Sequence, residues 1–146
     1  MIEIKKDKII ADGIERDIDN INVISYSRNY LSFSSRIADC AKYEKGIDSF
    51  YEEIKKAGLK DFVLYESEII NMGNVLSIDM EFYQYAGISI LKTSKENAEL
   101  YDVVLKCRNG KKETIPFRTY KEAEECLSVI QQALQQMKSE EQEKAL

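Results

Sequence analysis

The fold is decided above all by residues 101–134, which read YDVVLKCRNGKKETIPFRTYKEAEECLSVIQQAL. Two apolar-rich segments flank Asn109-Gly110, and Asn-Gly is the strongest short signal for a β-hairpin. A two-residue loop at this point predicts two cross-strand pairs, Val104 with Ile115 and Lys106 with Glu113. Pro116 is expected at a strand end or a sheet edge, because proline cannot donate a hydrogen bond to a neighbouring strand.

A helix is predicted directly after this hairpin. Thr119 and Glu122 have the spacing of a capping box, in which two side chains satisfy free N–H groups at the start of a helix. Apolar residues then recur at three- and four-residue spacing, at Ala123, Leu127, Ile130, Leu134 and Met137. Such a stripe is typical of a helix that packs one face on a sheet.

An earlier hairpin is predicted around Arg28-Asn29, since asparagine tolerates the left-handed backbone that tight turns require. Pairing the two arms across this turn separates the side chains into an apolar face and a serine face. The apolar face holds Ile24, Tyr26, Leu31 and Phe33, and the serine face holds Ser25, Ser27, Ser32 and Ser34. A short strand is expected before it in DKIIADG, ending at Gly13.

A short helix is predicted next. Ser49 and Glu52 have capping-box spacing, and Gly58 suits the end of a helix. The apolar face of this helix is expected to consist of Phe50, Tyr51 and Ile54.

Two further extended segments are predicted between residues 61 and 93. DFVLYESEII is interpreted as one strand that turns at residues 72–74, and the return arm alternates between apolar and polar residues. The residues expected to face inward are Leu76, Ile78, Met80 and Phe82, against Ser77, Asp79 and Glu81 outward. The arm is expected to bend near Ala86-Gly87 and to continue as ISILKT. The sequence leaves open whether residues 75–93 form one bent strand or two.

These elements predict an α+β fold of about seven antiparallel strands, with one short helix inserted after the third strand and a C-terminal capping helix. No linker, repeat or low-complexity tract divides the chain. We therefore expect a single domain over residues 1–138, followed by a charged tail over residues 139–146.

The composition narrows the functional classes. The chain has 146 residues and a net charge of −5, which argues against a general nucleic-acid binder, because such proteins need a basic surface. Histidine is absent, which excludes Ser-His-Asp and Cys-His mechanisms and removes the commonest metal ligand. Cys40, Cys107 and Cys126 have neither zinc-site nor disulfide spacing, and the last two are interpreted as small buried apolar residues. No metal or cofactor is expected.

No segment approaches the length of a membrane span, and MIEIKKDKII contains no apolar run of signal-peptide length. We therefore expect a cytoplasmic protein.

Two carboxylate pairs at strand spacing, Glu66 with Glu68 and Asp79 with Glu81, are interpreted as solvent-facing charges, because acid–base catalysis needs carboxylates that converge in a cleft.

Tyr83, Tyr85, Lys111 and Lys112 are the candidate partner-binding residues. The two tyrosines lie in a predicted strand, where an amphipathic ring suits either a core margin or a binding surface. Two basic groups surround predicted strand ends: Lys5, Lys6 and Lys8, and Arg108, Lys111 and Lys112. Protection of sheet edges against aggregation is the preferred interpretation of these lysines. The alternative is that they hold an anionic headgroup or a phosphate.

The order of elements resembles the pleckstrin-homology superfold, in which seven antiparallel strands precede one capping helix. Residues 101–134 are similar to the last hairpin and helix of bacterial pleckstrin-homology-like domains. The stretch IERDIDNINVISYSRNYLSF is similar to their early strands. The resemblance implies a sandwich or barrel of about seven strands, and no ligand residue is carried over to this chain.

The expected function is that of a non-enzymatic interaction module. It would bind a protein or peptide partner through a sheet edge or the groove beside the last helix. The alternative is a small acidic immunity or inhibitor protein that neutralises a toxin or nuclease by covering its basic site. An enzyme of unfamiliar type is the third possibility.

Overall fold

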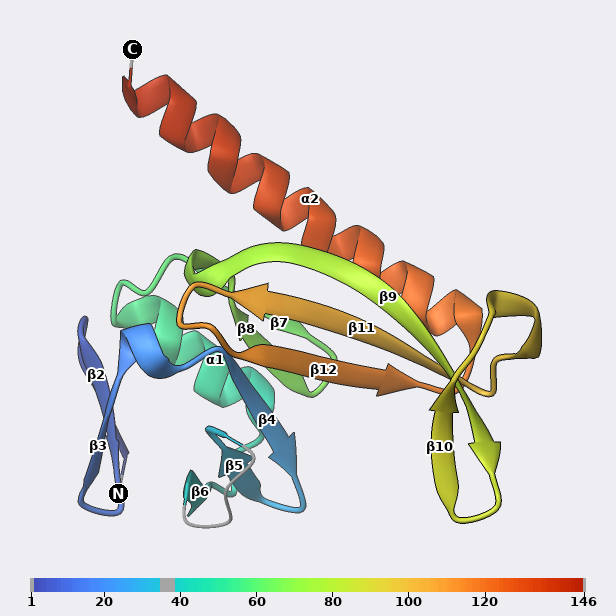
Figure 1. Ribbon diagram of the computed structural model, residues 1–146. Coiled ribbons are helices and arrows are strands. Elements are labelled where there is room, and N and C mark those ends of the chain that lie inside the picture. Colours follow the sequence, from blue (N-terminus) through green and yellow to red (C-terminus); the bar gives the residue numbers. More distant parts are fainter. Residues whose placement is uncertain (1, 35–38, 146) are drawn as a thin grey trace. The chain divides into compact units, whose positions relative to one another are not determined.

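The computed structural model describes residues 2–34 and 39–145 (Figure 1). The chain forms two compact units, Met1–Asn74 and Val75–Leu146, which are described separately below. The described residues contain twelve strands in three antiparallel sheets and two α-helices. The α+β class is therefore confirmed, whereas the expected number of about seven strands is wrong. The single domain over residues 1–138 with its tail stays a prediction.

The first unit begins with a three-stranded sheet of β1 (Ile2–Ile4), β2 (Lys8–Ala11) and β3 (Ile14–Asp17). The strand expected before Gly13 is β2, and β3 folds back on it. The turn between them places Asp12 and Gly13 at φ 52° and 78°, so both residues adopt the left-handed backbone of a tight hairpin.

A five-stranded sheet follows, in the order β6-β5-β4-β8-β7. It contains the predicted hairpin as β4 (Val23–Ser27) and β5 (Tyr30–Ser32), with Tyr26 opposite Leu31 as expected. Arg28 and Asn29 both have positive φ, which confirms the turn. The apolar face is confirmed as well, because Ile24, Leu31 and Phe33 are buried. The edge strand is β6 (Cys40–Lys42).

DFVLYESEII forms two strands instead of the single strand that was expected. They are β7 (Phe62–Tyr65) and β8 (Glu68–Asn71), joined by a tight turn in which Glu66 has φ 52°. The turn contains no glycine, proline or asparagine, and Ser67 is its one common turn residue, so the sequence signal for a turn is weak. Glu66 consequently lies in the turn, and Glu68 is half-buried beside Ser25, whose hydroxyl donates to its carboxylate. The turn expected at residues 72–74 is confirmed as the 3-10 helix η3 (Met72–Asn74).

The helix α1 (Ile47–Lys56) packs Phe50 and Ile54 into the core of the first unit. It begins two residues before Ser49 and has no side-chain cap, so the expected capping box is wrong here. Its end is confirmed. Gly58 has φ 85°, Gly58 N donates to Lys55 O at 3.0 Å, and Leu59 N donates to Ile54 O at 3.3 Å, which is a Schellman motif.

The second unit is a four-stranded sheet with a helix on one face, in the strand order β10-β9-β11-β12 (Figure 1). Its strands are β9 (Val75–Ala86), β10 (Ser89–Lys92), β11 (Leu100–Cys107) and β12 (Lys112–Phe117). The helix α2 (Tyr120–Ala145) contacts β9, β11 and β12. The segment 75–93 is thus two strands, since Gly87 at φ 62° turns the chain back on itself.

The hairpin of β11 and β12 is shifted by one residue from the expected register. Val103 faces Ile115 and Leu105 faces Glu113, so the expected Val104–Ile115 and Lys106–Glu113 pairs are wrong. The loop has three residues, 108–110, closed by Cys107 N donating to Lys111 O at 3.0 Å. Gly110 at φ 82° supplies the left-handed position that ends a three-residue loop. Pro116 lies in β12, which is an edge strand of the sheet, as expected.

The alternation of inward and outward side chains expected in β9 is interrupted at the start of the strand. A β-bulge lets Val75 pair with Cys107 and leaves Leu76 without an opposite residue. Val75 is therefore buried and Leu76 is 51% exposed, against the expectation that Leu76 faces inward. Beyond the bulge Ile78, Met80 and Phe82 share the face that α2 covers and are half-buried.

The stripe on α2 is confirmed. Ala123 and Ile130 are buried, Leu127, Leu134 and Met137 are half-buried, and Cys126 joins the buried set. The capping box is confirmed in part, because one of its two bonds to a backbone N–H is present among the described residues. Glu122 N donates to Thr119 Oγ1 at 3.2 Å, and Thr119 Oγ1 donates to Glu122 Oε1 at 2.8 Å.

Candidate functional site

The face of the second sheet that lies opposite α2 carries a cluster of charged and polar side chains. Residues paired across an antiparallel sheet share a face, and Tyr101, whose ring lies 6.0 Å from that of Tyr120, belongs to the helix-covered face. The neighbouring positions therefore belong to the other one, here called the polar face. Its central residues are Glu81, Tyr83, Lys92, Asp102 and Lys112.

Glu81 is the centre of the polar face. Its Oε1 accepts a hydrogen bond from the Tyr83 hydroxyl at 2.7 Å, and its Oε2 lies 3.6 Å from Lys92 Nζ and 3.8 Å from Lys112 Nζ. The Tyr83 hydroxyl and the two ammonium groups lower the pKa of Glu81. The same hydrogen bond raises the pKa of Tyr83 to about 12. Glu81 is thus ionised and Tyr83 is a neutral donor at neutral pH.

Asp102 lies directly opposite Glu81 on the adjacent strand. Its Oδ1 is buried and has no hydrogen-bond partner among the described residues. Burial, and secondarily the charge of Glu81, raise the pKa of Asp102. The pKa of Glu81 is therefore lowered and the pKa of Asp102 is raised from their ordinary values.

Beyond the polar face, the hairpin of β9 and β10 extends past the ends of β11 and β12 (Figure 1). Its residues 85–91, here called the hairpin tip, contain four large apolar side chains that are at least half exposed: Tyr85, Ile88, Ile90 and Leu91. Tyr85 and Ile90 oppose one another on the polar face, whereas Leu91 points to the other face with Gln84. Clustered exposed apolar residues of this kind mark interaction surfaces.

The two edges of this hairpin differ in their hydrogen bonding. On the β9 side, Tyr85 N donates to Glu99 Oε1 at 3.2 Å, and Glu99 N donates to Tyr83 O at 2.8 Å, so that edge is satisfied. Thr93 N donates to Phe82 O at 2.9 Å, which fixes the alternation along β10. Ile90 and Lys92 consequently turn their backbone groups outward. In the described parts of the chain, no strand pairs with this outer edge of β10.

Of the four sequence-predicted site residues, the structure brings Tyr83 and Lys112 together through Glu81. Tyr85 lies two residues further along the same face, on the hairpin tip. Lys111 lies between the three-residue loop and β12 and is exposed, outside the polar-face cluster. Sequence reasoning missed Asp102, Lys92 and the apolar residues of β10. The alternation of β9 signalled that Glu81 and Tyr83 share a face, but nothing local signalled what faces them.

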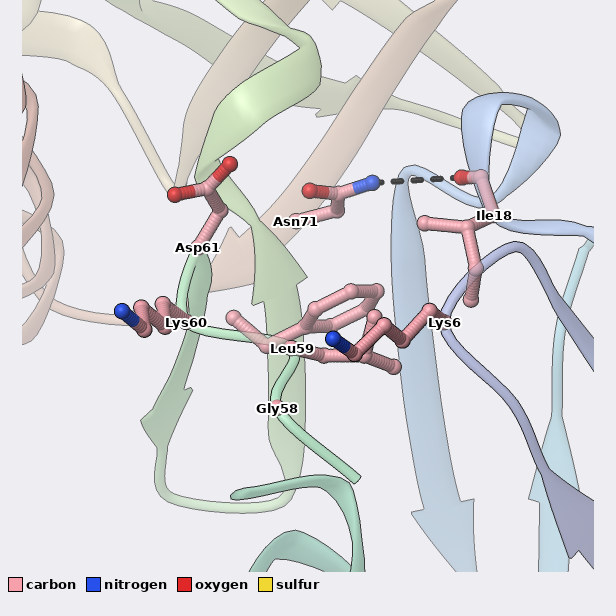
Figure 2. Close-up of a pocket in the computed structure, with 8 residues that line it drawn as sticks. Lys6, Ile18, Gly58, Leu59, Lys60, Asp61 and Asn71 are labelled. Carbon is pink, nitrogen blue, oxygen red and sulfur yellow. Dashed lines mark hydrogen bonds between the residues drawn. The ribbon is translucent and has the colours of Figure 1, made fainter. Parts of the chain in front are cut away.

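A separate pocket of about 310 Å³ lies in the first unit (Figure 2). It is lined by Lys6, Ile18, Gly58, Leu59, Lys60, Asp61, Phe62 and Asn71. Asn71 is buried, and its Nδ2 donates to Ile18 O at 3.2 Å and to Ile21 O at 3.0 Å. These bonds tie β8 to the 3-10 helix η1 (Ile18–Asn20) and hold one wall of the pocket.

The cysteines take no part in either site. Cys107 and Cys126 are buried, as the sequence predicted. Burial raises the pKa of the Cys107 thiol to about 11, so it is protonated at neutral pH. Within residues 2–34 and 39–145, no group of three or more cysteine and carboxylate side chains is arranged to hold a metal ion.

Comparisons of the chain with family models, with curated proteins and with solved structures found no match. The resemblance to pleckstrin-homology-like domains therefore stays a prediction. Neither helix in the described part of the chain is long and apolar enough to span a membrane.

Proposed function

We propose that the chain is a non-enzymatic interaction module, in which an extended segment of a protein or peptide partner adds to the outer edge of β10. The observation that carries this proposal is the combination of an open edge with apolar side chains on both faces of the same hairpin. Strand addition uses backbone hydrogen bonds for affinity and alternate side-chain contacts for specificity.

The backbone of β10 supplies the first part of this interaction. Ile90 and Lys92 direct their N–H and C=O groups outward, at the spacing that a new antiparallel strand meets. Exposed edges are usually blunted by charge, proline or a covering element. Glu99 covers the β9 side of the same hairpin, whereas in the described part of the chain the β10 side has only the charge of Lys92 at its end.

The side chains of the hairpin tip supply the second part. A strand added to β10 places alternate side chains on the two faces of the sheet. On one face they meet Ile90 and Tyr85, and on the other they meet Leu91. The partner segment is therefore expected to have apolar side chains on both faces of its strand. Lys92, already paired with Glu81, is positioned to meet an acidic residue at the end of the partner segment.

A non-enzymatic role agrees with the side chains available. The chain has no histidine, and the Cys107 thiol is buried with a raised pKa, so the common nucleophile–base pairs are missing.

The proposal is tested by selecting random linear peptides on the full chain and measuring the affinity of the enriched peptides. Ile90→Pro removes an outward N–H that no strand among residues 2–34 and 39–145 uses, so the fold should persist while the added strand loses a hydrogen bond. We expect binding to weaken about tenfold or more. Leu76→Thr is the matched control, because Leu76 is 51% exposed and Ile90 is 55% exposed in the same sheet.

Enriched peptides with alternating apolar residues that bind wild type and Leu76→Thr alike, but not Ile90→Pro, would support strand addition. Selection without enrichment, or peptides that bind all three chains equally, would contradict it.

Acid–base catalysis is a second candidate function, favoured by the Glu81–Asp102 pair. Two facing carboxylates whose pKa values are pushed apart are the usual arrangement of an acid and a base. Turnover of aryl glycosides, phosphodiesters or esters that is lost in both Glu81→Gln and Asp102→Asn would establish this function. Absence of turnover across such substrates would leave the pair as part of the interaction surface.

A further inference from the structure

Lys6 differs from the lysines on either side of it, Lys5 and Lys8. Lys5 Nζ lies 3.8 Å from Glu3 Oε1, and Lys8 Nζ lies 3.6 Å from Glu15 Oε2. Lys6, between them, makes no ion pair with any described residue and lines the pocket of the first unit. A Cβ placed on Gly58 would lie 3.6 Å from Lys6 Cε, so the lysine stem runs close to the backbone at the end of α1. Figure 2 shows Lys6 reaching across toward Leu59, while Lys60 and Asp61 point away from it.

Three of the eight residues that line the pocket have apolar side chains and form the apolar part of its floor. Leu59 and Phe62 are buried core residues, and Ile18 packs partly against the same core. An ammonium group beside an apolar floor matches a ligand with an anionic group at one end and a hydrocarbon body at the other. A volume of about 310 Å³ lies at the low end of ligand pockets, so the hydrocarbon body must be short.

Hydrogen bonds fix the walls of this pocket. Asn71 binds η1 through Ile18 O, the Schellman motif sets Gly58 and Leu59, and Met72 N donates to Asp61 O at 2.9 Å. A preformed cavity loses little conformational entropy when it is filled. The lining side chains carry two positive charges and one negative charge, which favours a monoanion over a phosphate dianion.

We propose that this pocket binds a small carboxylate with a short apolar body, whose carboxylate pairs with Lys6 and whose body lies on Leu59, Phe62 and Ile18. The site is independent of the proposed interaction surface on β10, so either can fail without the other.

Amide chemical-shift titrations of the full chain with hexanoate test the proposal. Acetate probes the charge alone, hexanamide probes the apolar body alone, and hexylamine reverses the charge. We expect saturable shifts at Lys6, Gly58, Leu59 and Asn71, with hexanoate binding more tightly than the other three compounds. Lys6→Gln should weaken hexanoate binding about tenfold, since a charge-assisted hydrogen bond is lost. Lys5→Gln, on the same turn, should leave it unchanged.

Several outcomes would overturn the proposal. They are an absence of saturable shifts at these amides, binding of hexylamine or inorganic phosphate at least as tight as that of hexanoate, and equal weakening in Lys5→Gln and Lys6→Gln. Lys6 is an exposed turn residue, so Lys6→Gln should leave the fold intact. Unchanged amide shifts elsewhere in the spectrum will show that the variant is folded.

Discussion

At the scale of single residues, Glu81 and Asp102 show how surroundings separate two carboxylates that face one another. Glu81 accepts a hydrogen bond from Tyr83 and lies near two ammonium groups, which lowers its pKa. Asp102 has a buried oxygen without a partner among the described residues, and its pKa is raised. Ionised Asp102 therefore opposes folding, whereas ionised Glu81 favours it.

We expect Asp102→Asn to stabilise the folded chain at neutral pH. Because the pKa of Asp102 is higher in the folded chain than in the unfolded chain, stability falls as the pH rises from the unfolded value, about 3.9, through the raised folded value. The substitution removes this loss. Thermal melts across the acidic to neutral range should show a gain that is largest at neutral pH and disappears below the unfolded pKa.

Asp79→Asn is the control for this experiment, because Asp79 is an exposed carboxylate of β9 on the same face of the sheet as Asp102. It should change the melting temperature little at any pH. If Asp102→Asn has the same melting temperature as wild type at every pH, the ionised Asp102 carboxylate does not destabilise the folded chain.

Gly110 is the second residue whose role can be tested alone. It has φ 82°, a conformation that β-branched residues strongly disfavour. We expect Gly110→Val to lower the free energy of unfolding by about 1–3 kcal/mol. Asn109→Ser, one residue earlier, should lower it by less than about 1 kcal/mol. Denaturant unfolding measures both, and equal effects would place the strained position elsewhere in the loop.

At the scale of elements, local patterns predicted α2 and the β4–β5 hairpin correctly. The Thr119–Glu122 cap and the stripe from Ala123 to Met137 depend only on neighbours along one helix. The wrong predictions concern one feature that depends on contacts between distant strands and one turn with a weak sequence signal. The bulge at Leu76 depends on how β9 meets β11, and the turn at Glu66 uses a residue that rarely adopts positive φ.

The candidate site divides in the same way. Tyr83 and Lys112 were predicted as binding residues, and the structure joins them through Glu81. Asp102 was not predicted, because its place opposite Glu81 requires the register of β9 and β11. The open edge was not assigned to β10 either, since the order of strands in a sheet is a tertiary property that single-strand patterns do not contain.

The packing of α2 gives a prediction at this scale. Ile130 is fully buried, so Ile130→Ala should lower the free energy of unfolding by about 2–5 kcal/mol. The neighbouring Val129 is 38% exposed, and Val129→Ala should change it by less than about 0.5 kcal/mol. An Ile130→Ala chain as stable as wild type would contradict the packing of this helix on its sheet.

At the scale of the whole molecule, we expect the two compact units to unfold together. The sequence predicts one domain over residues 1–138, which implies one cooperative transition. Ile54 lies in the core of the first unit and Ile130 is buried in the second. Calorimetry of Ile54→Ala and of Ile130→Ala should then show a single transition that moves in both variants. Two transitions, each moved by only one variant, would instead make each unit a domain.

Addition of a partner strand to β10 can be measured residue by residue through amide hydrogen exchange. In the free chain, the outward N–H groups of Ile90 and Lys92 should exchange fast, whereas that of Leu91, directed toward β9, should exchange slowly. Adding a selected peptide should slow exchange at Ile90 and Lys92 and leave the alternation at Leu91 unchanged. Protection that appears on α2 or in the first unit, with Ile90 and Lys92 still exchanging fast, would contradict the account.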